Sequence, residues 1–168
     1  MIGLLATPAT VRRTYTNDLI ASFASHLRVV RHGSTALVAA AEAKLRGEPV
    51  DAEALRTDLA ELFDAPGGAE IDVVALACTH FPLLLEELAA AAPRSCLWLD
   101  SGDAIARRLA NVLILPAGQV RTRRAGFTDA PGAASLAAAF EARGFSVTAS
   151  ISPAPDFEAA PVTDIASA

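Results

Sequence analysis

The apolar run Ile71–Cys78 constrains the fold more than any other feature of this sequence. Only Asp72 interrupts it, and such a run is typical of a parallel strand whose two faces are both covered. Similar strand patterns lie at Ile2–Ala6, Leu27–Arg31 and Cys96–Leu99. Because helical patterns separate these strands, we predict an α/β fold in which helices flank a largely parallel sheet.

Helix signals fill the stretches between the strands. Thr7 is a suitable N-cap and Pro8 a suitable first helical residue, and apolar residues spaced by four extend the pattern to Phe23 as one helix. Further helices are predicted at residues 34–46, 52–63, 83–92, 101–113 and 131–143, and further strands at residues 125–128 and 145–151. Residues 116–120 are predicted to be a loop, and the tail after Pro153 is predicted to be loose.

Composition and charge narrow the classes of function. Apolar residues make up 52% of the 168 residues, which is enough for a packed core, and the net charge is −5 without any concentration of Lys or Arg that would favour nucleic acid. No apolar run approaches the ~20 residues that span a bilayer, and the first residues lack the basic start of a signal peptide. Two cysteines give no disulfide framework. We therefore predict a cytoplasmic protein that binds neither nucleic acid nor membrane.

Cys78, Thr79 and His80 form the segment most suited to chemistry. They follow the most apolar strand, at the edge of the sheet where open α/β folds bind ligands, and they precede a helix start at Pro82. Free N–H groups at such a turn attract a carboxylate and favour a thiolate. Thr79 can hydrogen-bond a carboxylate, and His80 can move a proton to or from the thiol. A lone cysteine at a strand end is more often a small buried apolar residue, so the residues alone leave both interpretations open.

Three stretches resemble one enzyme family. Leu76-Ala-Cys-Thr-His-Phe-Pro-Leu-Leu84 resembles the second cysteine motif of glutamate racemases, which usually reads Gly-Cys-Thr-His-Tyr/Phe-Pro-Leu. Ile2-Gly-Leu-Leu-Ala-Thr-Pro-Ala-Thr10 is similar to the strand and helix that enter the family's second lobe, and Asp100-Ser-Gly-Asp-Ala-Ile-Ala106 resembles the stretch that returns to its first lobe. Over residues 1–150 the chain therefore resembles the carboxyl-terminal portion of a glutamate racemase, within the aspartate/glutamate racemase superfamily.

The resemblance implies two similar α/β lobes that bind glutamate between them, each with one catalytic cysteine, on opposite faces of the α-carbon. It implies that Cys78 is one acid/base, that Thr79 and His80 bind substrate, and that His80 also supports proton transfer at Cys78. Neither a metal nor pyridoxal phosphate is expected. The implied activity is the interconversion of L- and D-glutamate, which supplies D-glutamate for peptidoglycan and so serves the cell wall and cell shape.

A second catalytic cysteine is not recognisable in this sequence. Cys96 begins its predicted strand whereas Cys78 ends its own, so a strand length of ~17–20 Å would separate them in a parallel sheet, far beyond the ~3 Å of a proton transfer. We therefore expect Cys96 to lie in the core. The family's first-lobe motifs, an Asp-Ser-Gly near the amino terminus and a later Ala-Cys-Asn-Thr, have no counterpart here, since Asp100-Ser-Gly lies far along the chain and matches only by coincidence.

These observations predict the organisation of the chain. We expect residues 1–100 to be the second racemase lobe, residues 101–152 to be a helix and strand segment that returns to the first lobe, and residues 153–168 to be a loose tail. The missing first lobe is then a required partner, and the chain alone is expected to be inactive. Apolar faces that lack this partner also predict self-association into a homo-oligomer.

Other polar residues receive structural interpretations. His26 and His32 flank a strand and are expected to be structural or exposed, and Arg107 and Arg108 are expected on an exposed helix face. Glu42 resembles a cleft carboxylate only loosely, and we expect it on a solvated helix face.

Three other functions stay open at the level of sequence. They are a racemase of aspartate or another amino acid from the same superfamily, a non-catalytic remnant or binding module, and a thiol hydrolase that uses Cys78 and His80. The hydrolase is disfavoured, because residues two apart on a turn rarely align as nucleophile and base.

Overall fold

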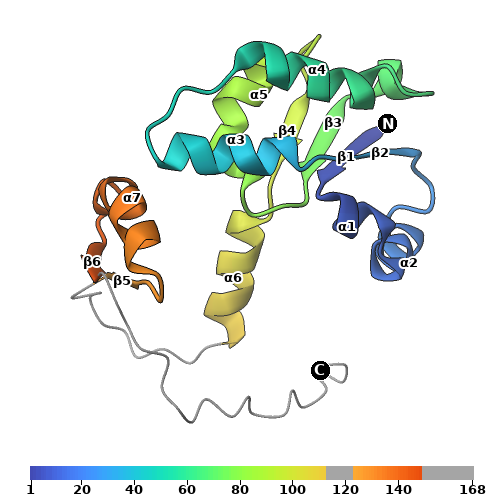
Figure 1. Cartoon of the computed structure of the whole chain (residues 1–168). Helices are drawn as coiled ribbons and strands as arrows, with labels where there is room; N and C mark the ends of the chain where they lie inside the picture. The colour runs from blue at the N-terminus through green and yellow to red at the C-terminus, as the bar shows by residue number, and fades with distance from the viewer. Residues whose placement is uncertain (113–122, 149–168) are drawn as a thin grey trace. The chain divides into compact units, whose positions relative to one another are not determined.

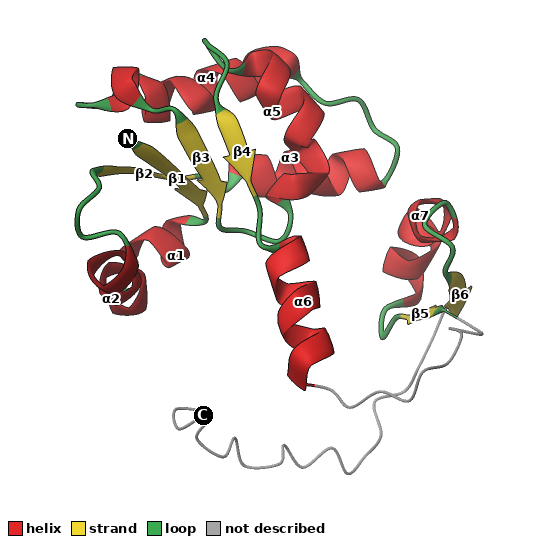
Figure 2. Ribbon diagram, turned by 180° about the vertical axis from the view of Figure 1, so that it is seen from behind, coloured by secondary structure: helices red, strands yellow, loops and turns green. Residues whose placement is uncertain are grey.

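The computed structural model of the chain describes residues 1–112 and 123–148. The chain divides into two compact units, the first spanning residues 1–118 and the second residues 119–168. The first unit contains a sheet of four parallel strands and the second a parallel pair, with helices between the strands (Figures 1 and 2). The predicted α/β fold with a largely parallel sheet is thus confirmed.

The first unit alternates strands and helices from its first residues. Its sheet has the strand order β2-β1-β3-β4, which places β1 and β3 in the middle and β4 at one edge. The elements in chain order are β1 (Ile2–Ala6), α1 (Pro8–Arg12), α2 (Thr14–Phe23), β2 (Val29–Gly33), α3 (Ala36–Leu45), α4 (Ala52–Phe63), the 3₁₀ helix η1 (Gly68–Glu70), β3 (Val73–Leu76), the 3₁₀ helix η2 (Phe81–Leu84), α5 (Leu85–Ala91), β4 (Leu97–Leu99) and α6 (Gly102–Val112).

One face of this sheet carries the hydrophobic core. Helices α3, α4 and α5 cover that face, whereas α1 and α2 lie on the other (Figure 1). Alternation along β1 follows this division: Gly3 faces Leu62 of α4, and Leu4 lines a cavity with Leu19 of α2. The core consists of apolar side chains from β1, β3, α3, α4, η2 and α5, together with Ile71 between η1 and β3, namely Leu5, Leu37, Ala41, Leu55, Leu59, Leu62, Phe63, Ile71, Val74, Leu76, Phe81, Leu84, Leu88 and Ala91.

The second face of the sheet is only partly covered. Leu97 and Leu99 of the edge strand β4 are 58% and 48% exposed. The apolar run of β3 predicted coverage on both faces; Val74 and Leu76 on one face are buried, whereas Val73 and Ala75 on the other are only half-buried. The reason is that a sequence pattern specifies which residues avoid water but not which element covers them.

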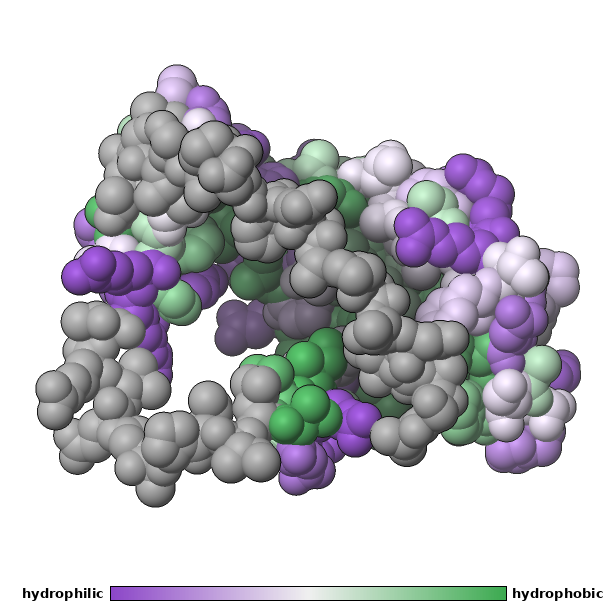
Figure 3. Space-filling view, turned by 90° about the horizontal axis from the view of Figure 1, so that it is seen from below, coloured by the Kyte–Doolittle hydropathy of each residue, from purple (hydrophilic) through white to green (hydrophobic). Residues whose placement is uncertain are grey.

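Helix α6 presents a second exposed apolar surface. None of its residues is buried, and Ile105, Leu109 and Val112 are 59%, 53% and 56% exposed. Their spacing places them on one side of the helix. Figure 3 shows the molecule from below, the direction in which α6 points in Figure 1, and hydrophobic side chains gather on that face. Arg107 and Arg108 of the same helix are exposed, as predicted.

The predicted single helix from Pro8 to Phe23 is wrong, because the chain breaks at Arg13. That residue has an extended backbone (φ −67°, ψ 137°) and separates α1 from α2. The hydroxyl of Thr16 donates a hydrogen bond of 2.7 Å to the carbonyl of Thr10, an acceptor that a continuous helix would use for its own ladder. Apolar spacing alone cannot reveal such a competing side-chain bond.

Other predicted elements are present with small shifts of their boundaries. The second strand begins at Val29 rather than Leu27, and the helix predicted from residue 83 begins as η2 followed by α5. Asp51 caps α4 by accepting hydrogen bonds from two backbone N–H groups, and Gly47 ends α3 with a φ of +79°. The predicted loop at residues 116–120 and the tail after Pro153 lie outside the described residues.

The second unit is a β-α-β arrangement. It comprises β5 (Arg124–Gly126), α7 (Ala130–Glu141) and β6 (Ser146–Thr148), with the two strands parallel. Phe140 of α7 packs edge-to-face against Phe127 and Phe145, with ring centroids 5.3 and 5.8 Å apart. This small aromatic cluster holds the helix against its strands.

Candidate active site

Cys78 lies where the sequence predicted it, just beyond the carboxyl end of β3. The strand ends at Leu76, and the turn that follows is anchored on one side by the hydrogen bond from the N–H of Ala77 to the carbonyl of Leu5. On the other side Phe81, which is fully buried, begins η2. These two anchors fix the turn that carries Cys78, Thr79 and His80.

The helix start after this turn differs from the prediction. An α-helix from Pro82 was expected to direct free N–H groups and a helix dipole at the thiol. Instead, the short 3₁₀ helix η2 comes first, and the N–H of Phe81 donates to the carbonyl of Cys78 at 3.3 Å. The N–H group of Phe81 is therefore not free to bind an anion at this turn.

Cys78, His80 and Glu42 form a chain of polar contacts. The sulfur of Cys78 lies 3.9 Å from Nδ1 of His80, and Nε2 of the same ring lies 2.7 Å from Oε1 of Glu42. When Nε2 donates its proton to the carboxylate, Nδ1 of a neutral ring is free to accept a proton from the thiol. The carboxylate then stabilises the positive charge that the ring acquires.

Glu42 makes a contact with His80 that its position in the sequence did not predict. It was expected on a solvated helix face, but its side chain is 36% exposed and bonded to His80, 38 residues further along the chain. Its second carboxylate oxygen lies 3.9 Å from Nη1 of Arg46, one helical turn away. The loose resemblance to a cleft carboxylate was the one signal that could have identified it.

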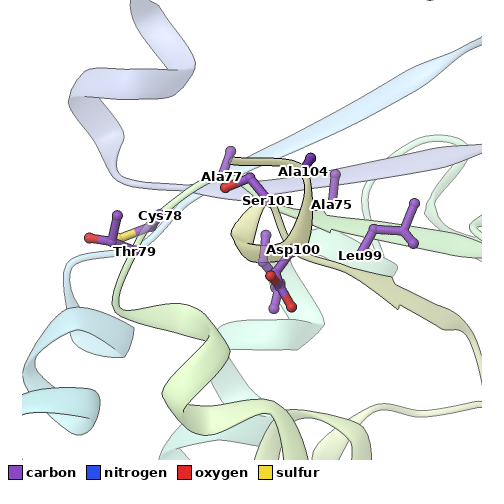
Figure 4. Close-up of a pocket in the computed structure, with 9 residues that line it drawn as sticks. Ala75, Ala77, Cys78, Thr79, Leu99, Asp100, Ser101 and Ala104 are labelled. Atoms are coloured by element: carbon purple, nitrogen blue, oxygen red, sulfur yellow. The ribbon is translucent and has the colours of Figure 1, made fainter. Parts of the chain in front are cut away.

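A pocket of about 540 Å³ opens beside Cys78. It lies at the carboxyl ends of β3 and β4, and Figure 4 shows Cys78 and Thr79 next to each other at one end, with Asp100 and Ser101 among the other lining residues. The lining residues are Ala75, Leu76, Ala77, Cys78, Thr79, Leu99, Asp100, Ser101 and Ala104. Since His80 is not among them, Cys78 connects the pocket with the His80–Glu42 pair.

Cys96 and Cys78 lie at opposite ends of the parallel strands, since Cys96 precedes β4 and Cys78 follows β3. In the pairing of β3 with β4, Val73 aligns with Leu97, so Cys96 precedes this level by one residue and Cys78 follows it by five. Six residues of strand correspond to roughly 20 Å. Cys96 is partly buried against the core, and burial raises the pKa of its thiol, although the positive charge of Arg94 acts in the opposite direction. The strand register agrees with the predicted separation, and Cys96 lies against the core without being fully buried in it.

The two other histidines lie outside this chain of contacts. His26 is exposed, whereas His32 belongs to a separate network in which its Nε2 lies 2.8 Å from Oδ1 of Asp58. The hydroxyl of Ser34 donates to the other oxygen of Asp58 at 2.6 Å and accepts from the N–H of Leu37 at 3.0 Å. This network ties the end of β2 to α4 and the start of α3, which is a structural role.

The described residues contain neither a candidate metal site nor a candidate membrane span. No group of three or more histidine, cysteine, aspartate or glutamate side chains lies close enough there to hold a metal ion. In the same residues, no helix has the length and apolar character to cross a membrane.

No protein-family model matches the chain. It is 53% identical over 112 residues to the glutamate racemase of Sphingopyxis alaskensis, which covers 67% of this chain and 42% of the relative. It is 46% identical over 113 residues to the glutamate racemase of Brucella ovis, with 67% and 41% covered. The chain thus spans about two fifths of the length of these curated relatives.

Solved structures give a similar result. The structure of the Escherichia coli glutamate racemase, in complex with L-glutamate and the activator UDP-MurNAc-ala, matches with a TM-score of 0.74 and 39% identity, over 87% of this chain and 56% of that one. A glutamate racemase isoform from Bacillus anthracis matches with a TM-score of 0.70 over 90% of this chain and 57% of that one, and its 20% identity supports the fold alone.

Proposed function

The chain is related to the glutamate racemases over about two thirds of its length, and from that premise we propose that it carries one half of a racemase catalytic centre, with Cys78 as its acid/base. The proposed substrate is glutamate, and the proposed role is the supply of D-glutamate for peptidoglycan in the cytoplasm. The observation that supports this most strongly is the polar chain Cys78–His80–Glu42 at the edge of a pocket.

The geometry suggests how Cys78 would act. As a thiolate, Cys78 takes the α-proton of glutamate and becomes a thiol; in the reverse direction the thiol returns a proton to the same face. His80 accepts or returns the thiol proton through Nδ1, 3.9 Å from the sulfur, and Glu42 balances the charge on the ring at 2.7 Å. Thr79, which lines the pocket beside Cys78, is the proposed hydrogen-bond donor to a substrate carboxylate.

Inversion at the α-carbon requires a second acid/base on the opposite face. Cys96 is unsuited to this role, because it lies roughly 20 Å away along the sheet and has a raised thiol pKa. The sequence contains two cysteines in all. We therefore propose that the opposing thiol comes from residues outside this chain, and that residues 1–100 act as the second lobe, residues 101–152 as the segment that returns to the first lobe and residues 153–168 as a tail.

Adding a polypeptide that supplies the second acid/base tests this proposal. The chain is mixed or fused with a polypeptide that corresponds to the unmatched part of the Sphingopyxis alaskensis relative, and the racemisation of L-glutamate is followed by circular dichroism. We expect turnover in the completed protein and its loss in Cys78→Ala, with Cys96→Ala as the matched control that stays active. A completed protein that racemises aspartate better than glutamate would overturn the proposed substrate. A folded completed protein that neither binds nor racemises glutamate would favour a non-catalytic binding module.

A further inference from the structure

Lys44 is the single lysine of the chain, and it joins two elements of the candidate site. It lies on α3, two residues after Glu42. Its Nζ donates a hydrogen bond of 2.8 Å to the carbonyl of Leu83 in η2 and lies 2.7 Å from a carboxylate oxygen of Glu87 in α5. Lys44 therefore connects α3 to the segment that follows His80.

This bridge runs between the same elements as the contact of Glu42 with His80. Leu83 is three residues after His80, so η2 is held to α3 at its start by Glu42 and near its end by Lys44. Residues two apart on an α-helix project about 200° apart, so the two side chains reach η2 from different sides of α3. Two bridges of this kind fix the rotation of α3 as well as its distance from η2.

The apolar residues buried between α3 and η2 do not by themselves determine how these two elements are oriented. Leu37 and Ala41 of α3 pack with Phe81 and Leu84 of η2, and all four are fully buried. Apolar contacts are not directional, so they keep the two elements together without setting the orientation of the His80 ring. Hydrogen bonds supply that orientation.

We propose that Lys44 is a positioning residue that keeps Glu42 in line with His80 and thereby holds the His80 ring against Cys78. The inference rests on the proposed function, because it assigns Lys44 to the proton path described above. The bond from Glu42 to His80 weakens whenever the ring gives up its positive charge, whereas the bond from Lys44 to the carbonyl of Leu83 does not depend on that proton. Lys44 thus preserves the alignment through a cycle of proton transfer.

We expect Lys44 to act through its hydrogen bonds and not through its net charge, because a neighbouring carboxylate already balances that charge. Glu87 neutralises the ammonium group at 2.7 Å, and Arg46 is the cation that lies near Glu42, at 3.9 Å. Replacement by arginine should preserve the bridge, since guanidinium can donate to both the carbonyl and the carboxylate. Replacement by methionine keeps an unbranched side chain that is one atom shorter than lysine, and it removes every donor.

The test uses the full chain in a Cys96→Ser background, so that Cys78 is the one thiol. Two signals are measured well below the thermal midpoint: the rate of alkylation of Cys78 by iodoacetamide, and the NMR signal of the hydrogen-bonded ring N–H proton of His80. The ring proton of His32, which is held by Asp58 at 2.8 Å, is the internal reference. Arg56→Met is the matched control, because it removes the ion pair of Arg56 with Glu53 on α4.

We expect Lys44→Met to slow the alkylation of Cys78 about five-fold, as the loss of one hydrogen bond implies, and to abolish the ring proton signal of His80. Lys44→Arg and Arg56→Met should retain both signals. If Lys44→Met does not fold, Lys44→Gln, which is also one atom shorter than lysine and carries no positive charge, gives the same readout. The inference would be overturned if Lys44→Met changed neither the alkylation rate of Cys78 nor the ring N–H signal of His80.

A parallel variant separates this inference from the proposed function. If Glu42→Gln slows the alkylation of Cys78 while Lys44→Met does not, the positioning role of Lys44 is wrong and the proton path stands. If Glu42→Gln leaves Cys78 unchanged, the proton path itself is wrong, and the positioning role falls with it.

Discussion

Oε1 of Glu42 and Nε2 of His80 lie 2.7 Å apart, although 38 residues separate them in the chain. Glu42 comes from α3, which packs on the core face of the sheet, and His80 comes from the turn after β3. Because of this contact, Cys78, at the end of β3, is the first residue of the polar chain Cys78–His80–Glu42. The reactivity of Cys78 is therefore expected to depend on a carboxylate on another element.

Removing the charge of Glu42 tests this dependence. We expect Glu42→Gln to slow the alkylation of Cys78 at neutral pH roughly five-fold, because a neutral amide stabilises the charged ring about 1 kcal/mol less than a carboxylate does. Glu48→Gln is the matched control, since Glu48 pairs with Arg46 at 2.7 Å and does not contact His80. Equal rates in the two variants would show that Glu42 does not act on the thiol.

The two cysteines should differ in reactivity. Burial raises the pKa of the Cys96 thiol, so little of this thiol is ionised at neutral pH. We expect iodoacetamide at pH 7.5 to label Cys78 well before Cys96, and peptide mapping by mass spectrometry resolves the two sites. Faster labelling of Cys96 in the folded chain would contradict the assignment of Cys78 as the reactive thiol.

The sequence predicted where Cys78 lies but not which residues complete its site. The position of Cys78 could be predicted because a buried strand and the turn after it have local signals. The role of Glu42 could not, because helical periodicity separates apolar from polar faces but does not say which distant residue a polar side chain meets. The break at Arg13 and the exposed Leu97 escaped prediction for the same reason, since each depends on a contact made, or not made, by another segment.

The ion pair of Glu87 with Lys44 should contribute to the pH dependence of stability. Burial raises the pKa of Glu87, but the hydrogen bond and charge of Lys44 outweigh this and hold the pKa below its usual value. The pair therefore stabilises the fold above the ordinary carboxylate pKa of about 4.3 and loses this contribution as the pH falls below it. Because both side chains are partly exposed, the contribution is about 0.2–1 kcal/mol.

Urea unfolding of the chain and of Glu87→Gln, at pH 7 and at pH 4, measures this contribution. We expect the variant to be less stable at pH 7 and the difference to shrink at pH 4. A difference that stays constant or grows at pH 4 would show that the charge of Glu87 is not the cause.

The exposed side of α6 is expected to drive self-association. Ile105, Leu109 and Val112 form an apolar stripe that water covers in the single chain, and association would remove it from water. In sedimentation velocity we expect the apparent mass to rise with concentration, and Leu109→Glu to reduce that rise. Arg107→Glu, an exposed change on the same helix, is the control. A compact monomer at high concentration would rule out this role for α6.

The racemisation of L-glutamate by the isolated chain tests the central claim most directly, because that claim assigns this chain one thiol of an opposed pair. Circular dichroism of the reaction mixture follows the formation of D-glutamate. We predict no turnover above that of Cys78→Ala. Turnover by the isolated chain that Cys78→Ala abolishes would show that one thiol suffices, and would contradict the requirement for a second acid/base outside this chain.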